Sequence, residues 1–204
     1  GMSTTSCVPF ERSFLWSRLR AGTPESDALP GDSVKDRGGT GPAIGDRLPP
    51  LTLPRARDGV PVAWRAPQRG APVVVFLADV DSGRDYVREL ATWEPRLRQW
   101  AGRPLVVLPG NAGPDGEGAE LEGRGVEFMV DPNGEAHRRC GVGEGEAAVF
   151  IADRWGQIYA VERASSEAGL PGVEEIEEWM RYLSTQCPEC GVPDEPGRGE
   201  WEAK

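Results

Sequence analysis

The stretch VVVFLADVDSGRDYVREL, at residues 73–90, decides the fold of this chain. Its first part, residues 73–78, is a short and largely β-branched apolar run, the pattern of a strand buried on both faces. From about Ser82 the spacing changes to that of an amphipathic helix. One face of this helix carries the apolar residues Tyr86, Leu90, Trp93 and Leu97. The stretch therefore predicts a buried strand followed directly by a helix, the basic unit of an α/β domain.

The turn between this strand and this helix, ADVDSG, is the place where an α/β sheet usually carries its chemistry. Its backbone N–H groups open the helix and can receive negative charge. Asp81 and Ser82 are expected to cap the helix N-terminus through their side-chain oxygens. Asp79 and Asp81 could instead form a cation or polar-ligand site, but one turn supplies too few ligands for a cation. We therefore expect the turn residues to be structural.

Turn signals divide the rest of this region into further strands and helices. Asp58-Gly59 and the DPNG sequence at 131–134 are strong turn sequences, and Pro95 is expected to kink or restart the helix in which it falls. Strands are predicted at 60–64, 104–108, 126–130, 147–152 and 157–162. Helices are predicted at 135–140 and 173–185. The last two strands form a hairpin that leads to the final helix.

Three phrases of the sequence resemble the peroxiredoxin and AhpC/TSA (redoxin) family of thioredoxin-like proteins. GDRLPPLTLPRARDGVPVAW, at 45–64, is similar to the opening that precedes the central strand of that family. DPNGEAHRRCGV, at 131–142, and AAVFIADRWGQI, at 147–158, are similar to two of its later phrases. The resemblance covers residues 45 to about 186. It implies an α/β, thioredoxin-like fold with a central mixed β-sheet flanked by helices.

The sequence departs from the family pattern at the positions that would carry its chemistry. The redox cysteines of the family would fall at Gly83 and Tyr86, where no thiolate can form. The cis-proline of the family would fall at Ala147, and holding an X-Ala bond in the cis form costs about 2.5–4 kcal/mol. The peroxidase or disulfide chemistry of the family is therefore not expected at this turn.

The composition divides the chain into four segments. Residues 1–21 contain a candidate helix and form an N-terminal helical extension, and residues 22–43, rich in Gly and Pro, are a flexible linker. Residues 44–186 are the thioredoxin-like domain. Residues 187–204 are an acidic tail that begins with the CxxC sequence CPEC.

Cys187 and Cys190, the two cysteines of this CxxC sequence, are the candidate catalytic residues. The pair could be a redox dithiol, because the spacing allows a small disulfide loop. It could be half of a structural zinc site completed by Cys7, Cys140 or His137, or by the same pair of a second subunit. It could also have no assigned role. A position at a helix C-terminus among acidic residues raises thiol pKa values and disfavours the redox interpretation.

His137, the only histidine of the chain, is expected to lie at the surface of the helix 135–140. The net charge of −10 is unevenly distributed: residues 1–72 carry +3 and residues 73–204 carry −13. We interpret the small basic excess of residues 1–72 as a solvated surface. An acidic main domain repels phosphate backbones, so nucleic acid is not an expected partner. The chain contains no run of about 20 apolar residues, so no membrane span is expected and a cytoplasmic location is predicted.

The sequence supports two hypotheses for function. The first is a redoxin-like protein of the AhpC/TSA type that lacks a peroxidatic cysteine at the usual position, with a thiol–disulfide role through Cys187 and Cys190 and a protein thiol or disulfide as its partner. The alternative is a non-catalytic thioredoxin-fold binding or scaffold module, for which a homodimer and structural zinc at the tail cysteines are both options. No cofactor is expected for the first hypothesis, and the second allows structural zinc.

Overall fold

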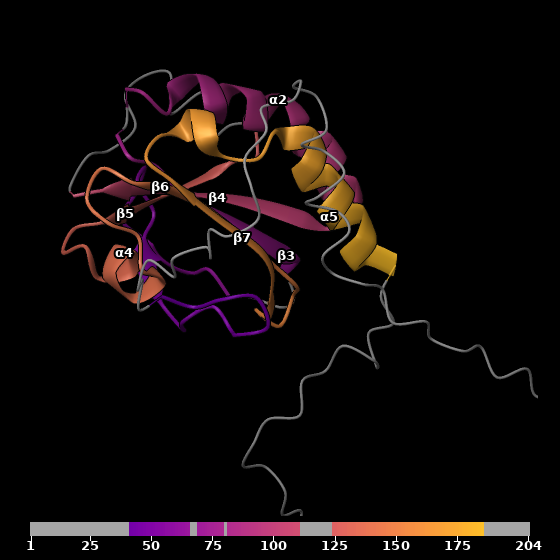
Figure 1. The fold of residues 1–204 in the computed structure, drawn as a ribbon, viewed down its shortest axis with the longest axis horizontal. Coiled ribbons are helices and arrows are strands. Elements are labelled where there is room, and N and C mark those ends of the chain that lie inside the picture. The colour runs from indigo at the N-terminus through magenta and orange to yellow at the C-terminus, as the bar shows by residue number, and fades with distance from the viewer. Residues whose placement is uncertain (1–40, 66–68, 80, 111–123, 186–204) are drawn as a thin grey trace, which may run out of the picture. The chain divides into compact units, whose positions relative to one another are not determined.

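The computed structural model describes residues 41–65, 69–79, 81–110 and 124–185 (Figure 1). All of them belong to one compact unit, Gly38–Lys204. The predicted N-terminal helical extension, most of the predicted linker and the CxxC tail lie outside the described residues. The structure therefore tests the predictions for the thioredoxin-like domain.

A five-stranded mixed sheet forms the centre of the domain. Its strand order is β5-β4-β3-β6-β7. The central strand β3 (Ala71–Phe76) pairs in parallel with β4 (Gly102–Pro109), which pairs in parallel with β5 (Glu127–Asp131). On its other side β3 pairs antiparallel with β6 (Ala147–Ala152), and β6 forms the predicted hairpin with β7 (Ile158–Ala164). The mixed sheet confirms the fold class predicted from the sequence.

Helices cover both faces of this sheet. α2 (Arg84–Gln99) and α5 (Val173–Thr185) pack against each other on one face (Figure 1). α4 (Glu135–Cys140) follows β5 on the other face, and a short 3₁₀ helix, η2 (Glu167–Gly169), follows β7. α4 and α5 have the bounds that the sequence predicts. None of the described helices is long and apolar enough to cross a bilayer.

α2 runs through the proline at which the sequence predicts a kink or a restart. The predicted restart at Pro95 is wrong, because the helix continues through Pro95 to Gln99. Proline removes one backbone donor, but Pro95 lies on the exposed side, while Ala91 and Leu97 on either side of it are buried. The burial of the apolar face therefore holds the helix together across the missing hydrogen bond.

A separate hairpin packs beside the main sheet. β1 (Thr52–Pro54) pairs antiparallel with β2 (Pro61–Ala63), across the turn that contains Asp58 and Gly59. Gly59 has a φ of 68°, a left-handed value that favours glycine, and Asp58 accepts a hydrogen bond from the Val60 N–H. The hairpin contacts β5, so it extends one side of the domain without joining the main sheet.

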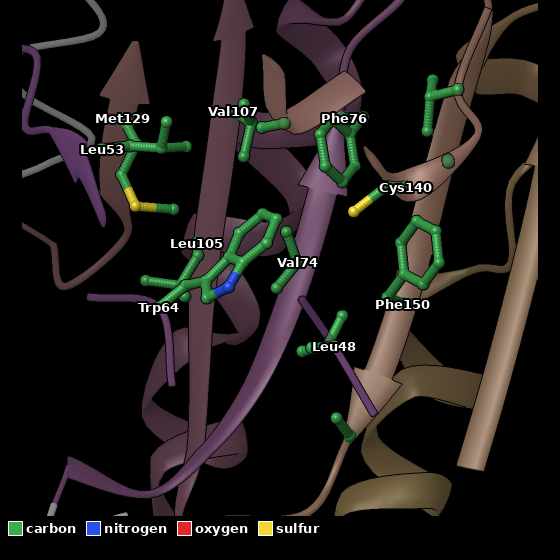
Figure 2. Packing of buried hydrophobic residues seen from close by; sticks show 14 of the residues in the cluster. Leu48, Leu53, Trp64, Val74, Phe76, Leu105, Val107, Met129, Cys140 and Phe150 are labelled. Carbon is green, nitrogen blue, oxygen red and sulfur yellow. The ribbon is translucent and has the colours of Figure 1, made fainter. Parts of the chain in front are cut away.

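The core on the face that α4 and the hairpin cover is organised around Trp64 (Figure 2). Its side chain is fully buried, its indole N–H donates to the Pro49 carbonyl at 2.6 Å, and its ring meets Phe76 edge to face. Apolar residues that alternate along the strands complete this layer, among them Val74, Leu105, Val107 and Phe150. The residues that alternate with these along the same strands lie on the other face of the sheet, which α2 and α5 cover. The central strand β3 is therefore buried on both faces, as its sequence predicts.

Candidate functional site

The strand-to-helix turn lies at the carboxyl edge of the parallel strands. β3, β4 and β5 run in the same direction, so their carboxyl ends share this edge. β6 runs the opposite way and begins there, and β7 returns and ends there. Segments that follow β3, β5 and β7 can therefore meet at one place, which is where open α/β sheets bind ligands.

Glu167, the first residue of η2, forms hydrogen bonds with this turn. Its carboxylate accepts a hydrogen bond from the Ala78 N–H at 2.8 Å through Oε1, and from the Ser82 hydroxyl at 3.0 Å through Oε2. A longer contact of 3.5 Å joins Oε1 to the Asp79 N–H. Only 6% of Glu167 is exposed. The chain's own carboxylate therefore occupies the N–H groups that a bound anion would otherwise use.

Sequence reasoning missed Glu167. The residue lies 89 positions after Ala78, at the start of η2, in a segment of small and polar residues that carries no recognisable motif. The signal that could have found it is topological. The hairpin prediction places the end of its second strand at the carboxyl edge of the central strand, so an acidic residue shortly after that strand is a candidate for the turn.

Asp79, and not Asp81 or Ser82, organises the turn itself. Its Oδ2 accepts hydrogen bonds from the N–H groups of Asp81 and Ser82, each at 3.1 Å. The helix begins two residues later than expected, at Arg84, with Gly83 at the N-cap and no side-chain cap. The prediction that Asp81 and Ser82 cap the helix is therefore wrong, because both lie in the turn and donate their N–H groups back to Asp79. Among the described residues, no group of three or more His, Cys, Asp or Glu side chains forms a metal site.

Gly83 and Tyr86, where the sequence resemblance leads us to expect the family's cysteines, both have packing roles in the structure. Gly83 is buried, and a Cβ there would lie 2.8 Å from a methyl group of Leu77. The Tyr86 hydroxyl donates to the Pro171 carbonyl at 2.9 Å. Burial raises the pKa of the Tyr86 phenol, and Glu89 and Glu175 add to this effect. Tyr86 therefore stays neutral and ties α2 to the segment before α5.

Ala147, where the sequence resemblance leads us to expect the family's cis-proline, is the first residue of β6. It is fully buried and pairs with Ala164 of β7. No peptide bond within the described ranges is cis. The residue therefore belongs to the sheet ladder.

His137 and Asp131 form a second polar pair at the carboxyl edge, on the α4 side. Nδ1 of His137 lies 2.7 Å from Oδ2 of Asp131, which also accepts the His137 backbone N–H. The imidazole packs edge to face on Phe76, with ring centroids 4.9 Å apart. Burial alone would raise the pKa of the Asp131 carboxyl, but the hydrogen bonds from His137 outweigh it and lower that pKa.

The expected surface position of His137 is wrong. Only 14% of its side chain is exposed, because the turn at 131–134 folds α4 directly back onto the end of β5. Nε2 is buried and has no hydrogen-bond partner among the described residues. Asp131 orients the ring as in a general-base pair, but the enclosed Nε2 is closed to a substrate in this arrangement.

Cys140 belongs to the hydrophobic core. It is fully buried beside Phe76 and Phe150 (Figure 2). Burial raises the pKa of its thiol to about 12, although Arg163 and Arg139 act in the opposite direction. A thiol that is both inaccessible and protonated is a poor nucleophile and a poor metal ligand. Cys140 is therefore a packing residue.

The candidate catalytic pair, Cys187 and Cys190, lies outside the described residues, and so does Cys7. Their role as a dithiol or as zinc ligands stays a prediction. The last described helix, α5, ends at Thr185, two residues before the pair begins. The described domain therefore ends directly before the CxxC sequence.

No family model and no curated protein sequence matches the chain. Solved structures do match it. A putative thiol:disulfide interchange protein DsbE from Chlorobium tepidum aligns at 16% identity over 70% of this chain and 98% of its own, with a TM-score of 0.53. Peroxidoxin BcpB from Mycobacterium tuberculosis aligns at 17% identity over 69% and 97%, with a TM-score of 0.54. AhpC from Mycobacterium tuberculosis aligns at 14% identity over 74% and 98%, with a TM-score of 0.53.

These similarities define the class of fold. The chain has a thioredoxin-like fold, as the resemblance in its sequence implied, and its structural neighbours are redoxins of the peroxiredoxin and thiol–disulfide types. At such low sequence identity the likeness establishes the fold alone. Function has to be argued from the residues of the site.

Proposed function

We propose that this chain is a redoxin-like protein of the AhpC/TSA type in which the strand-to-helix turn is structural and thiol–disulfide exchange is carried by Cys187 and Cys190. The observation that carries the proposal is the hydrogen bonding of Glu167 to the Ala78 N–H and the Ser82 hydroxyl. A reactive thiolate needs a positive environment and unoccupied N–H donors. At this turn a buried carboxylate takes those donors, and Tyr86 stands where the family has its peroxidatic cysteine.

The distribution of the cysteines supports the tail as the site. Cys140 is enclosed in the core, and its thiol pKa is raised to about 12. Of the other three cysteines, Cys187 and Cys190 have the spacing of a redox dithiol. The pair follows the end of α5 by two residues, so it stays attached to the domain by a short connection.

The proposed step is a dithiol–disulfide exchange with a protein disulfide. The thiolate of one tail cysteine attacks the partner disulfide, which forms a mixed disulfide and releases one partner thiolate. The second tail cysteine attacks the mixed disulfide, which leaves a Cys187–Cys190 disulfide and a second partner thiol. Two electrons pass to the partner, and a thiol reductant restores the dithiol.

The test is turnover of a fluorescent protein disulfide by the full chain in the presence of a dithiol reductant. Cys187→Ser should abolish turnover, and the control Cys140→Ala should keep it, because Cys140 is a packing residue. Mass spectrometry of the oxidised protein should show a loss of two protons that maps to Cys187 and Cys190. Turnover that survives Cys187→Ser, or four free thiols after oxidation, would refute the proposal.

The closed turn also favours a second candidate, a non-catalytic binding or scaffold module. In this hypothesis two copies of the chain each contribute Cys187 and Cys190 to a structural zinc site, so that four thiolates surround the metal. Metal analysis and native mass separate the two candidates. One zinc per dimer, lost in Cys187→Ser together with the dimer, would support the module and exclude the redox tail.

A further inference from the structure

A cavity of about 400 Å³ lies at the amino ends of β4 and β5. This is the edge of the sheet opposite to the strand-to-helix turn. Residues from the β1–β2 turn, from the segment before β3, from the end of α2 and from the starts of β4 and β5 line it. Five of the lining residues are arginines: Arg55, Arg57, Arg69, Arg98 and Arg103. The cavity therefore brings together arginines from four separate segments of the chain.

Two carboxylates at or beside this cavity, those of Glu127 and Asp58, are each shared between two arginines. Glu127 binds both Arg69, at 2.7 Å, and Arg103, at 2.5 Å. Burial acts to raise the pKa of the Glu127 carboxyl, but the two arginines outweigh it and the pKa is lowered. One carboxylate with two guanidinium partners leaves one positive charge uncompensated.

The same arrangement recurs in the β1–β2 turn. Asp58 lies 2.6 Å from Arg55 and 3.5 Å from Arg57. The hydrogen bond from Arg55 contributes most to lowering the pKa of Asp58 to about 2, so the carboxylate is ionised at neutral pH. A third acidic residue, Glu94, pairs with Arg98. Counted over the described residues, the five arginines of the cavity thus bind three carboxylates, so the arginines outnumber these partners by two.

The wall of the cavity is fixed while its rim is accessible. Arg103 has only 8% of its side chain exposed, and it donates to the Trp64 carbonyl at 3.2 Å as well as to Glu127. In contrast, the exposed fractions of the Arg57, Arg69 and Arg98 side chains are 52%, 45% and 68%. A rigid base with exposed guanidinium groups around it can receive a charged ligand at a small cost in side-chain ordering.

Gly125 keeps this cavity open at the start of β5. Its φ of 96° is a left-handed value, and a Cβ at this position would collide with the carboxylate of Glu94 and the guanidinium of Arg98. The absence of a side chain lets that ion pair lie against the strand. The geometry therefore depends on a glycine at the wall of the cavity.

We propose that this cavity binds a small molecule that carries a phosphate group. Guanidinium groups bind phosphate oxygens through paired N–H donors, and a phosphate dianion matches the excess of two positive charges. A volume of about 400 Å³ is in the range of small-ligand pockets. None of the described lining residues takes part in the redox proposal, so the two proposals are independent of each other.

The test is calorimetric titration of the full chain with inorganic phosphate and with pyrophosphate, at pH 7.5 and constant ionic strength. The variant Arg57→Gln/Arg69→Gln removes the two excess charges and leaves each of the three carboxylates with one arginine. The matched control Arg139→Gln/Arg154→Gln lowers the net charge by the same amount at exposed positions outside the cavity. We expect saturable binding by the wild type and the control, and binding at least about tenfold weaker in the cavity variant.

A second measurement needs no variant. Phosphate that binds the folded chain should raise its urea midpoint above the value in sodium chloride of equal ionic strength. No saturable binding of either probe to the wild type, or equal losses in the two double variants, would overturn the proposal. Binding of citrate with no binding of phosphate would also overturn it, since the site would then select carboxylates.

Discussion

Truncating Glu167 to alanine tests whether the turn after β3 is structural. The change removes the acceptor of two hydrogen bonds, from the Ala78 N–H at 2.8 Å and from the Ser82 hydroxyl at 3.0 Å. A hydrogen bond to a charged group contributes about 1.5–3 kcal/mol, and a buried donor left unpaired costs about 1–3 kcal/mol. Ala78 is only partly buried, so water can reach its N–H after the truncation. We therefore expect Glu167→Ala to lower the free energy of unfolding by about 2 kcal/mol.

The assay is urea unfolding followed by tryptophan fluorescence, with the wild type, Glu167→Ala, Glu167→Gln and a control. Glutamine keeps a carbonyl oxygen for the Ala78 N–H, so it should cost about 1 kcal/mol. Glu178 is an exposed glutamate of α5, and Glu178→Ala should change stability by at most about 0.5 kcal/mol. A loss of about 2 kcal/mol corresponds to a decrease of about 4–8 °C in Tm for a domain of this size.

The result that refutes the reasoning is a Glu167→Ala variant as stable as Glu178→Ala. An increase in the free energy of unfolding would refute it more strongly, because it would show that the carboxylate of Glu167 destabilises the fold. Groups of that kind are typical of functional sites. The double variant with Ser82→Ala gives an internal check, since the two truncations remove the same hydrogen bond and should add to less than the sum of their separate effects.

Three further predictions follow from single contacts. Tyr86→Phe removes the hydrogen bond to the buried Pro171 carbonyl and should cost about 1–2 kcal/mol in urea unfolding; an unchanged midpoint would contradict the contact. Cys140 should resist iodoacetamide at pH 8 until the chain unfolds, and fast labelling of the native chain would contradict its burial. Burial raises the pKa of its thiol from an ordinary 9.0 to about 12 in the folded chain. The contribution of this thiol to stability is therefore present below pH 9 and lost as the pH rises from 9 to 12. The pKa of Glu127 is lowered in the folded chain, so its contribution to the free energy of unfolding is present above its ordinary pKa of 4.5 and lost as the pH falls through the folded value. The loss of stability in Glu127→Gln should therefore be large at pH 7 and smaller at pH 3.5. An equal loss at both pH values would contradict the ion pair.

Most of the fold could be predicted from local sequence. The bounds of α4 agree with the prediction because Gly134 and Gly141, both in the left-handed conformation, end the flanking segments on either side of it. α5 starts directly after Pro171-Gly172, a strong local signal. The central strand was recognisable because it is buried on both faces and so reads as a continuous apolar run. Each of these signals lies within a few residues of the element that it defines.

The contacts of the sites could not be predicted in the same way, because they join distant segments. Glu167 reaches the turn from 89 positions away, and the burial of His137 depends on how α4 folds back over Phe76. The basic excess in residues 1–72 indicates a solvated surface, and the side chains of Arg57 and Arg69 are about half exposed. The sequence does not indicate that the structure also brings Arg55, Arg57 and Arg69 together around one cavity with arginines of α2 and β4. Composition gives the number of charges but not which of them meet.

The two edges of the sheet differ in how their charges are compensated, and this difference indicates where a ligand can bind. At the carboxyl edge the N–H donors of the turn are paired with Asp79 and Glu167, so an incoming anion would have to displace a carboxylate already in place. At the amino edge, within the part of the chain that the structure describes, the arginines outnumber the carboxylates that they bind, so an anion can add contacts to arginines that share a carboxylate. Replacing a paired group costs the interactions that it made, whereas compensating an excess charge does not. An anionic ligand should therefore favour the amino edge, and Arg57→Gln/Arg69→Gln should weaken its binding more than any change at the turn.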